Sequence, residues 1–256
     1  MSTLSPIRFS VCVEQIFRTM PFEQRLEHVA DQGFTAFEFG SREGKDMNIT
    51  LALKMALRLD VGAFIGSSTP LADPAARPKF LSDISHTAAL AVDLSCEKLI
   101  VFAGPLVPGL SRKQQHASIV EGLLAAADTA ADAGVTLVLL PLNPIDHPDS
   151  FLTSSDEGFA IVREVNHPQV RLLFHTYHQQ ISEGNLTKRI NDNFDLIGHI
   201  QVADVPGRHE PGTGEINFDY LFGLLREKEY KGYVGLDYTP HLDPVASLRA
   251  VRALAQ

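Results

Sequence analysis

The residues best suited to chemistry stand at the ends of short apolar runs. The segment 171–178, RLLFHTYH, places His175 and His178 three positions apart. Asp237 closes another apolar run, and Glu14 follows a third. Imidazole and carboxylate side chains can bind a divalent cation or move protons between carbon atoms. Either chemistry requires these side chains to meet in space, so it depends on the elements that carry them.

Other polar residues occupy comparable positions. Glu38 lies inside an apolar run between two phenylalanines, and Gln201 lies inside another. The segment 202–218, VADVPGRHEPGTGEINF, is constrained by glycine and proline, and arginine suits the bidentate capture of a carboxylate or phosphate. We expect this loop to form a substrate clamp, with a solvated turn as the alternative. The tip of the loop carries Arg208, His209 and Glu210.

Composition excludes several classes of protein. The chain has 256 residues and a formal net charge of −9, which argues against a nucleic-acid-binding or anionic-membrane surface. Cys12 and Cys96 are too few for a disulfide framework and favour a reducing compartment. No apolar stretch approaches the roughly 20 residues of a membrane span, and no secretory signal is apparent. We therefore expect a soluble cytoplasmic protein.

Short apolar runs alternate with helical patterns along the whole chain. Most of the runs are continuously apolar, as strands buried on both faces require. Three predicted helices end on glycine directly before a strand, which is typical of repeated strand–helix units. We predict an α/β fold, a (β/α)8 TIM barrel in a single domain of residues 1–256. The candidate strands are residues 7–13, 35–39, 61–65, 98–103, 136–140, 170–174, 199–203 and 233–237.

Helical periodicity predicts the intervening elements. Residues 21–33 place apolar side chains on one stripe, and residues 154–165 open with Ser154 and Glu157 at capping-box spacing. Residues 66–78 are predicted to be a loop. A doubly wound sheet is the alternative fold, but the glycine pattern of a dinucleotide site is missing after the first strand.

A barrel of this kind carries its active site at the C-terminal ends of its strands. We therefore expect Glu14, His175, Gln201 and Asp237 to converge on one rim. Each has a structural alternative, because a single polar residue at a strand end often caps the strand or contacts water.

Several stretches resemble the hydroxypyruvate isomerase family of xylose-isomerase-like barrels, within the sugar isomerase/epimerase superfamily. The resemblance runs nearly end to end. It implies a divalent metal bound by a Glu ending strand five, an Asp ending strand six, a Gln or His in strand seven and a Glu ending strand eight. The two glutamates would also move the proton between adjacent carbons. The similar stretches are residues 21–39, 147–165, 184–225 and 232–240.

This chain departs from that ligand set. The resemblance places Leu140 and His175 at the first two ligand positions, retains Gln201 at the third and shortens the fourth to Asp237. Leucine can neither bind a metal nor carry a proton, so the two-glutamate mechanism cannot operate. Hard cations also lose the carboxylate oxygens that they prefer. An apolar Leu140 further predicts a larger, drier pocket that suits a substrate less polar than hydroxypyruvate.

We predict an isomerase-like enzyme that acts on a small hydroxy-carbonyl compound by acid/base proton transfer, without a cofactor. His175 is the predicted general base, with Asp237 or Glu14 orienting it or returning the proton. Isomerisation, epimerisation, and a lyase or cyclisation step all stay open. The resemblance matches His178 to a family histidine and Arg208 to a substrate-binding arginine. The predicted substrate-binding residues are Arg208, His178, Gln201, Glu38, His209 and Glu210.

Two alternatives stay open. The first is a metal-dependent hydroxypyruvate isomerase whose unusual ligands would be His175, Gln201 and Asp237, binding Zn²⁺ or Fe²⁺ more readily than Mg²⁺. The second is an inactive relative that serves as a binding subunit. The expected partner is a small carbonyl compound. Barrels of the family tend to pair, so we also expect a homodimer.

Overall fold

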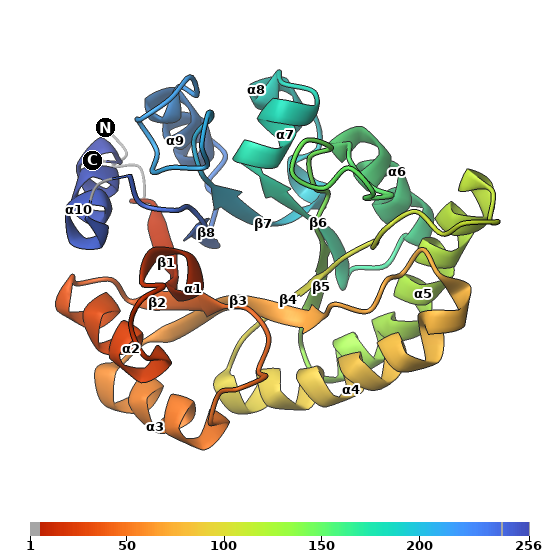
Figure 1. Cartoon of the computed structure of the whole chain (residues 1–256), viewed down its shortest axis with the longest axis horizontal. Coiled ribbons are helices and arrows are strands. Elements are labelled where there is room, and N and C mark those ends of the chain that lie inside the picture. Colours follow the sequence, from red (N-terminus) through yellow and green to blue (C-terminus); the bar gives the residue numbers. More distant parts are fainter. Residues whose placement is uncertain (1–5, 242, 256) are drawn as a thin grey trace. The chain divides into compact units, whose positions relative to one another are not determined.

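The structure, a computed structural model, describes residues 6–241 and 243–255. Its eight strands follow one another in sequence order around a closed barrel (Figure 1). The predicted TIM barrel is therefore confirmed, and every predicted strand is present. The strands are β1 (Arg8–Cys12), β2 (Ala36–Phe39), β3 (Asp60–Ser67), β4 (Lys98–Val101), β5 (Thr136–Leu139), β6 (Val170–His175), β7 (Ile197–Val202) and β8 (Tyr233–Leu236).

Helices connect the strands. Two short 3₁₀ helices, Pro74–Ala76 and Phe194–Leu196, add to the α-helices. No helix in the described ranges is long and apolar enough to cross a membrane. The α-helices are α1 (Val13–Ile16), α2 (Phe22–Asp31), α3 (Met47–Leu57), α4 (Arg77–Leu94), α5 (Arg112–Asp132), α6 (Ser155–Val165), α7 (Thr176–Ser182), α8 (Leu186–Asp192), α9 (Phe218–Glu227) and α10 (Pro244–Leu254).

Two local predictions need correction. Ser154 caps α6 as expected, but its hydroxyl accepts from the N–H of Asp156, and the Glu157 carboxylate pairs with Arg112. The guanidinium is a stronger partner than a backbone N–H, so the expected capping box is not formed. The predicted loop 66–78 is also too long, because β3 extends to Ser67 and α4 begins at Arg77.

The described residues group into two compact units. The first comprises residues 6–62, 200–241 and 243–255, and the second comprises residues 63–199. The expectation of a single domain stays a prediction.

In the first unit, β1 pairs with β2 on one side and with β8 on the other. Cys12 lies opposite Glu38, and Ser10 lies opposite Gly235. Gly235 in turn lies opposite Gln201 of β7. Residues in register on neighbouring parallel strands present their side chains to the same face. The register thus gathers polar side chains from three separate parts of the sequence.

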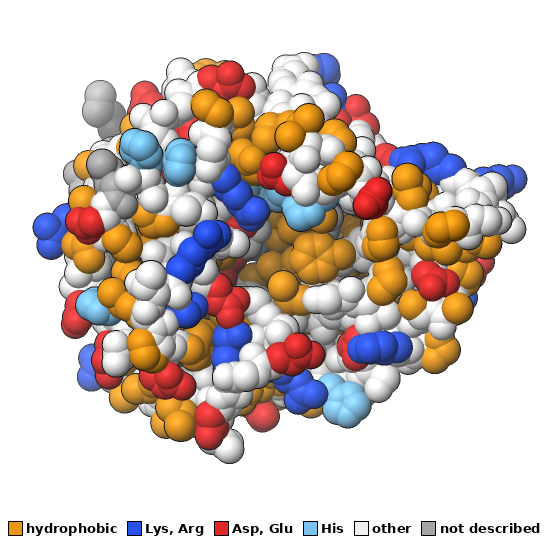
Figure 2. Space-filling view, in the orientation of Figure 1, with side chains coloured by type: hydrophobic (Ala, Val, Ile, Leu, Met, Phe, Trp, Pro, Cys, Tyr) orange, Lys and Arg blue, Asp and Glu red, His pale blue; other side chains and the backbone are white. Residues whose placement is uncertain are grey.

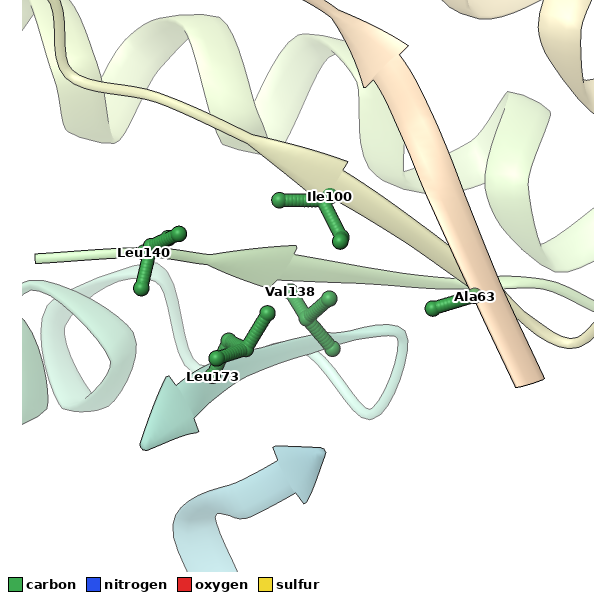
Figure 3. Packing of buried hydrophobic residues seen from close by; sticks show 5 residues of the cluster. All are labelled: Ala63, Ile100, Val138, Leu140 and Leu173. Atoms are coloured by element: carbon green, nitrogen blue, oxygen red, sulfur yellow. The ribbon is translucent and has the colours of Figure 1, made fainter. Parts of the chain in front are cut away.

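In the second unit, β4 pairs with β3 and β5, and β5 pairs with β6. Helices α4, α5 and α6 pack against the strands that precede or follow them (Figure 1). One face of these strands carries a buried apolar cluster, shown in Figure 3. Its side chains come from β3, β4, β6 and the end of β5, so this part of the sheet is held by apolar packing. The members are Ala63, Ile100, Val138, Leu140 and Leu173.

Candidate active site

Glu38 of β2 is the centre of a buried polar cluster in the first unit. One carboxylate oxygen accepts a short hydrogen bond from the Ser10 hydroxyl. The other accepts from the Gln201 amide at 2.7 Å and from the Cys12 thiol at 3.4 Å. Only 1% of Glu38 is exposed, so these donors replace the water that a carboxylate otherwise needs. Glu38 and Gln201, both predicted to bind substrate, are therefore bonded to each other.

Two glycines leave the space that the Glu38 carboxylate fills. A Cβ atom on Gly235 would lie 2.6 Å from Oε1 and 2.8 Å from Oε2 of Glu38. A Cβ atom on Gly62 would lie 2.6 Å from the Ser10 Oγ and 3.0 Å from the Glu38 Oε1. These approaches are too close for carbon, so the cluster requires glycine at both positions.

The Cys12 thiol belongs to the same cluster and is protonated at neutral pH. Burial raises its pKa well above the ordinary value of 9.0, and the carboxylates of Glu38 and Asp237 raise it further. The Arg208 charge lowers the pKa, but by less. A protonated thiol is a poor nucleophile. Cys12 therefore acts as a hydrogen-bond donor to Glu38 rather than as a reactive group.

Asp237 and Arg208 form an ion pair at the end of β8. The Arg208 Nη2 donates to the Asp237 carboxylate in a short contact, and its Nε lies 3.4 Å from the Asp237 carbonyl oxygen. The Arg208 side chain is 25% exposed and the Asp237 side chain is 11% exposed. The predicted acid/base carboxylate is thus bonded to the predicted substrate-binding guanidinium. A substrate carboxylate that binds Arg208 therefore competes with Asp237 for the guanidinium.

The loop after β7 is folded around the carboxylate of Asp204. Asp204 is fully buried and accepts hydrogen bonds from the backbone N–H groups of Val205, Gly212, Gly214 and Ile216, at 2.8 to 3.1 Å. A carboxylate with four backbone donors fixes the course of the chain between them. The loop that carries Arg208 is therefore ordered by its own sequence.

His209 and Glu210 connect this loop to the segment that follows β8. The His209 Nδ1–H donates to the carbonyl oxygen of Thr239 at 2.8 Å, and its ring lies 5.0 Å from that of His241. The Glu210 carboxylate is fully buried and accepts from the His241 N–H at 2.8 Å. These contacts of His209 and Glu210 thus join the loop to residues 239–241, whereas Arg208 contacts the predicted catalytic Asp237.

Glu14 of α1 is paired with a lysine that the sequence did not single out. Its carboxylate lies 2.5 Å from the Lys45 Nζ and accepts from the Gly40 N–H at 2.5 Å. Lys45 also donates to the carbonyl oxygen of Ser41 at 2.6 Å, and 9% of its side chain is exposed. These contacts hold residues 40–45 beside α1. Glu14, predicted to move a proton, is thus paired with a cation.

In the second unit, Asn143 fixes the orientation of His178. The Asn143 Oδ1 accepts from the N–H groups of Ile145 and Asp146, which leaves its amide NH₂ facing the ring. The Nδ1 of His178 lies 2.8 Å from that NH₂ and accepts from the Asn143 backbone N–H at 3.2 Å. Because Nδ1 accepts, the neutral ring carries its proton on Nε2. His178 is therefore oriented as an Nε2–H donor.

Three histidine rings lie in a contiguous group around His178. The ring of His175 lies 4.7 Å from that of His178, and the ring of His147 lies 5.8 Å from it on centroids. His175 and His178 are buried, whereas His147 is half-exposed. The structure thus brings the two predicted histidines together and adds a third from the loop after β5.

Leu140 lies where the resemblance implies the first metal ligand, and its surroundings do not fit a metal. Leu140 packs in the cluster with Ile100, Val138 and Leu173 (Figure 3). At the fourth position, Asp237 is occupied by the Arg208 ion pair. Within residues 6–241 and 243–255, no group of three or more His, Cys, Asp or Glu side chains is arranged to hold a metal ion. Leu140 therefore offers no donor atom at the first ligand position that the resemblance implies.

A pocket of about 490 Å³ adjoins Leu140. One wall is apolar and is formed by residues at or near the ends of β3, β4 and β5, including Ile65, Phe102 and Leu142. The segment 146–150, which contains His147, supplies most of the polar lining. Figure 2 shows apolar side chains beside a hollow over the ends of β4 and β5. The volume lies in the range typical of small-molecule sites, roughly 300–1,000 Å³.

Sequence patterns located some of these residues and missed others. Asp204 lies two residues after β7 and Asn143 is the first polar residue after β5, so their positions near strand ends could have selected both for a structural role. Lys45 and His147 lie in irregular loops, where neither spacing nor periodicity marks them. The predicted convergence of four side chains on one rim stays a prediction.

Residues 26–254 match the model of a protein family that is described as xylose isomerase-like TIM barrel. The chain belongs to this family. The putative hydroxypyruvate isomerase of Xenopus laevis is 34% identical over 94% of both chains. The hydroxypyruvate isomerase of Escherichia coli strain K12 is 32% identical over 95% of this chain and 97% of its own. The 2-oxo-tetronate isomerase of Cupriavidus necator is 33% identical over 94% of this chain and 96% of its own.

Solved structures agree with this membership of the xylose isomerase-like family. A structure from Brucella melitensis named AP endonuclease, family 2, is 30% identical, with a TM-score of 0.88 over 98% of this chain and all of that one. A D-psicose 3-epimerase from Clostridium cellulolyticum has a TM-score of 0.83 at 18% identity, which shows the fold alone.

Proposed function

We propose that the protein is an isomerase-type enzyme that moves a proton next to the carbonyl group of a small hydroxy-carbonyl compound, without a bound metal. The names of its full-length relatives, hydroxypyruvate isomerase and 2-oxo-tetronate isomerase, support the class of reaction. One observation carries the metal-independent form. Where the family's first ligand is expected, Leu140 packs in an apolar cluster, while His175 and His178 stand at the end of the next strand.

The reaction needs one base and one proton donor. The base removes a proton from the hydroxyl-bearing carbon, and the electron pair moves toward the carbonyl oxygen to give an enediol. The proton returns to the former carbonyl carbon, and the hydroxyl proton passes from one oxygen to the other, so atoms balance. We assign proton removal to His175 and hydrogen bonding of the substrate oxygen to the Nε2–H of His178.

The sequence predicts that Arg208 recognises an acid group of the substrate. Arg208 is the candidate for a substrate carboxylate, which would draw the guanidinium away from Asp237. Asp237 and Glu14 stay the candidates that the sequence predicts for returning the proton. His175 and His178 are buried, so the proposal requires the side chains that cover them to move when the substrate enters.

A nucleic-acid substrate is a poorer proposal, although one similar structure is named an AP endonuclease. The net charge of −9 works against the phosphate contacts that supply most of the affinity for nucleic acids.

The first test is the metal content of the protein. The chain would be purified without tags or chelators, dialysed against mixed divalent ions and analysed by elemental mass spectrometry. Turnover of hydroxypyruvate and 2-oxo-tetronate would then be followed by NMR, with and without EDTA. We expect far less than one metal ion per chain, and turnover that EDTA does not change.

The second test replaces His175 by glutamine, which keeps the size of the side chain and removes its basic nitrogen. We expect the turnover number to fall about 10²–10⁴-fold, while His86→Gln, on the exposed side of α4, keeps wild-type turnover. Loss of activity with EDTA and recovery with Zn²⁺ would favour the metal-dependent alternative. Absence of turnover in folded protein would favour a binding subunit. Either result contradicts the proposal.

A further inference from the structure

We propose that the pocket beside Leu140 binds an apolar substituent of the hydroxy-carbonyl substrate, such as an aryl or branched alkyl group. That the bound compound is a substrate rests on the proposed function. Its binding to the pocket can be tested without turnover. Such binding commits the protein to a class of compound that differs from the short polar oxo-acids in the names of its relatives.

The apolar wall is the first observation. Ile65, Phe102 and Leu142 pack against the buried cluster that contains Leu140, so the wall is continuous with the core of the second unit. A hydroxyl group placed against such a wall would lose its hydrogen bonds to water without replacement. An apolar group placed there is stabilised because its surface is removed from water.

The charge of the lining is the second observation. Asp146 and Asp149 are the ionisable acids, and none of the described lining residues is lysine or arginine. The pocket therefore disfavours the carboxylate of an oxo-acid. An uncharged end of the substrate fits it better.

The distribution of polar groups sets the orientation of the ligand. His147 and Ser150 belong to the segment 146–150, which supplies most of the polar lining, and Ser68 adds a polar residue outside it. His147 is also in ring contact with His178. An apolar group against the strand ends thus leaves the carbonyl and hydroxyl oxygens on the side of the histidines, where the proposed proton transfer takes place.

Two exposed apolar side chains belong to residues that adjoin the lining residues in the chain. Leu106 and Ile145 are 48% and 75% exposed. Leu106 donates its N–H to the carbonyl oxygen of Asp149 at 2.7 Å, and Ile145 precedes Asp146 in the chain. Both residues therefore lie next to lining residues, which favours ligands with an apolar part over small polyols.

The test compares two hydroxymethyl ketones that differ in one group. 2-Hydroxyacetophenone carries a phenyl ring where 1,3-dihydroxyacetone carries a second hydroxymethyl group, and both are uncharged. Their dissociation constants would be measured by titration with ligand-observed NMR. We expect the phenyl compound to bind at least about tenfold more tightly, because its ring is removed from water.

Variants locate the binding site. Leu140→Gln places an amide in the apolar wall, and we expect it to weaken binding of the phenyl compound about tenfold. The matched control is Leu124→Gln on α5, where the side chain is 53% exposed. Ile65→Thr, at a half-buried position, is the second variant in case Leu140→Gln does not fold.

Each outcome decides the inference. Equal or tighter binding of 1,3-dihydroxyacetone, binding of neither compound, or equal effects of Leu140→Gln and Leu124→Gln would overturn it. Tight binding of the phenyl compound by a protein that turns over no hydroxy-carbonyl compound would sustain the pocket and contradict the proposed function. Turnover of hydroxypyruvate without preference for the phenyl compound would do the reverse.

Discussion

At the scale of single residues, hydrogen bonds and space decide which polar groups are available for chemistry. Glu38 is held by Ser10 and Gln201, and Glu14 is held by Lys45. Glu38 lies within β2 and Glu14 in α1, and their bonds to protein partners give them a structural role. His178 is likewise held by a protein partner, because Asn143 fixes the tautomer and orientation of its ring. Each of these predicted site residues is thus oriented by hydrogen bonds within the protein.

Gly235→Ala tests how tightly the Glu38 cluster is packed. The added Cβ would overlap both carboxylate oxygens, so we expect the free energy of unfolding to fall by about 1–3 kcal/mol in urea denaturation. Gly223→Ala on α9 is the control, since its Cβ would meet no atom within 4 Å. There we expect unchanged or slightly higher stability, because alanine favours a helix by up to roughly 1 kcal/mol. Similar effects of both changes would show that the cluster tolerates an added atom.

At the scale of elements, the loop after β7 shows why a constrained sequence makes an ordered segment. Its glycines allow the chain to turn around Asp204, whose carboxylate collects four backbone N–H groups. The same loop holds Arg208 beside Asp237. Order within the loop thus determines where the proposed recognition group for the substrate lies.

Asp204→Asn tests this account of the loop. Asparagine replaces one carboxylate oxygen by an NH₂ group, which donates and cannot accept. Some of the backbone N–H groups that bond to Asp204 therefore lose their acceptor. We expect a loss of about 1–3 kcal/mol in the free energy of unfolding and faster cleavage of the loop by a nonspecific protease. Asp93→Asn, on the exposed side of α4, should change neither. Unchanged protease resistance in Asp204→Asn would mean that other contacts order the loop.

At the scale of the whole molecule, buried acids link stability to pH. Burial raises the pKa of Cys12 above 9.0 and, as the largest cause, raises the pKa values of Tyr230 and Tyr238 above their ordinary value of 10.0. The folded chain therefore binds these protons more tightly than the unfolded chain. This contribution to stability is complete below pH 9 and is lost as the pH rises. Lys98, whose pKa is lowered by burial, acts in the opposite direction.

We expect the melting temperature to fall as the pH is raised from 8 to 10.5. Cys12→Ser removes the titrating thiol, so its melting temperature should fall less between pH 9 and 10, measured by differential scanning calorimetry. The comparison isolates the thiol from the tyrosines and from Lys98, which both proteins share. Parallel curves for the two proteins would show that Cys12 titrates alike in the folded and unfolded chains. The expected homodimer and cytoplasmic location stay predictions.

The sequence by itself determined the fold. Eight continuous apolar runs separated by helical patterns are compatible with few architectures, and burial of these runs dominates the free energy of folding. It also determined that Leu140 cannot bind a metal and that His175 stands near His178. The tertiary structure decided the partners of the charged side chains, because Glu14–Lys45, Glu38–Gln201 and Arg208–Asp237 join residues distant in sequence. Spacing along a chain carries no signal for such pairs, whose geometry follows from strand register and loop course.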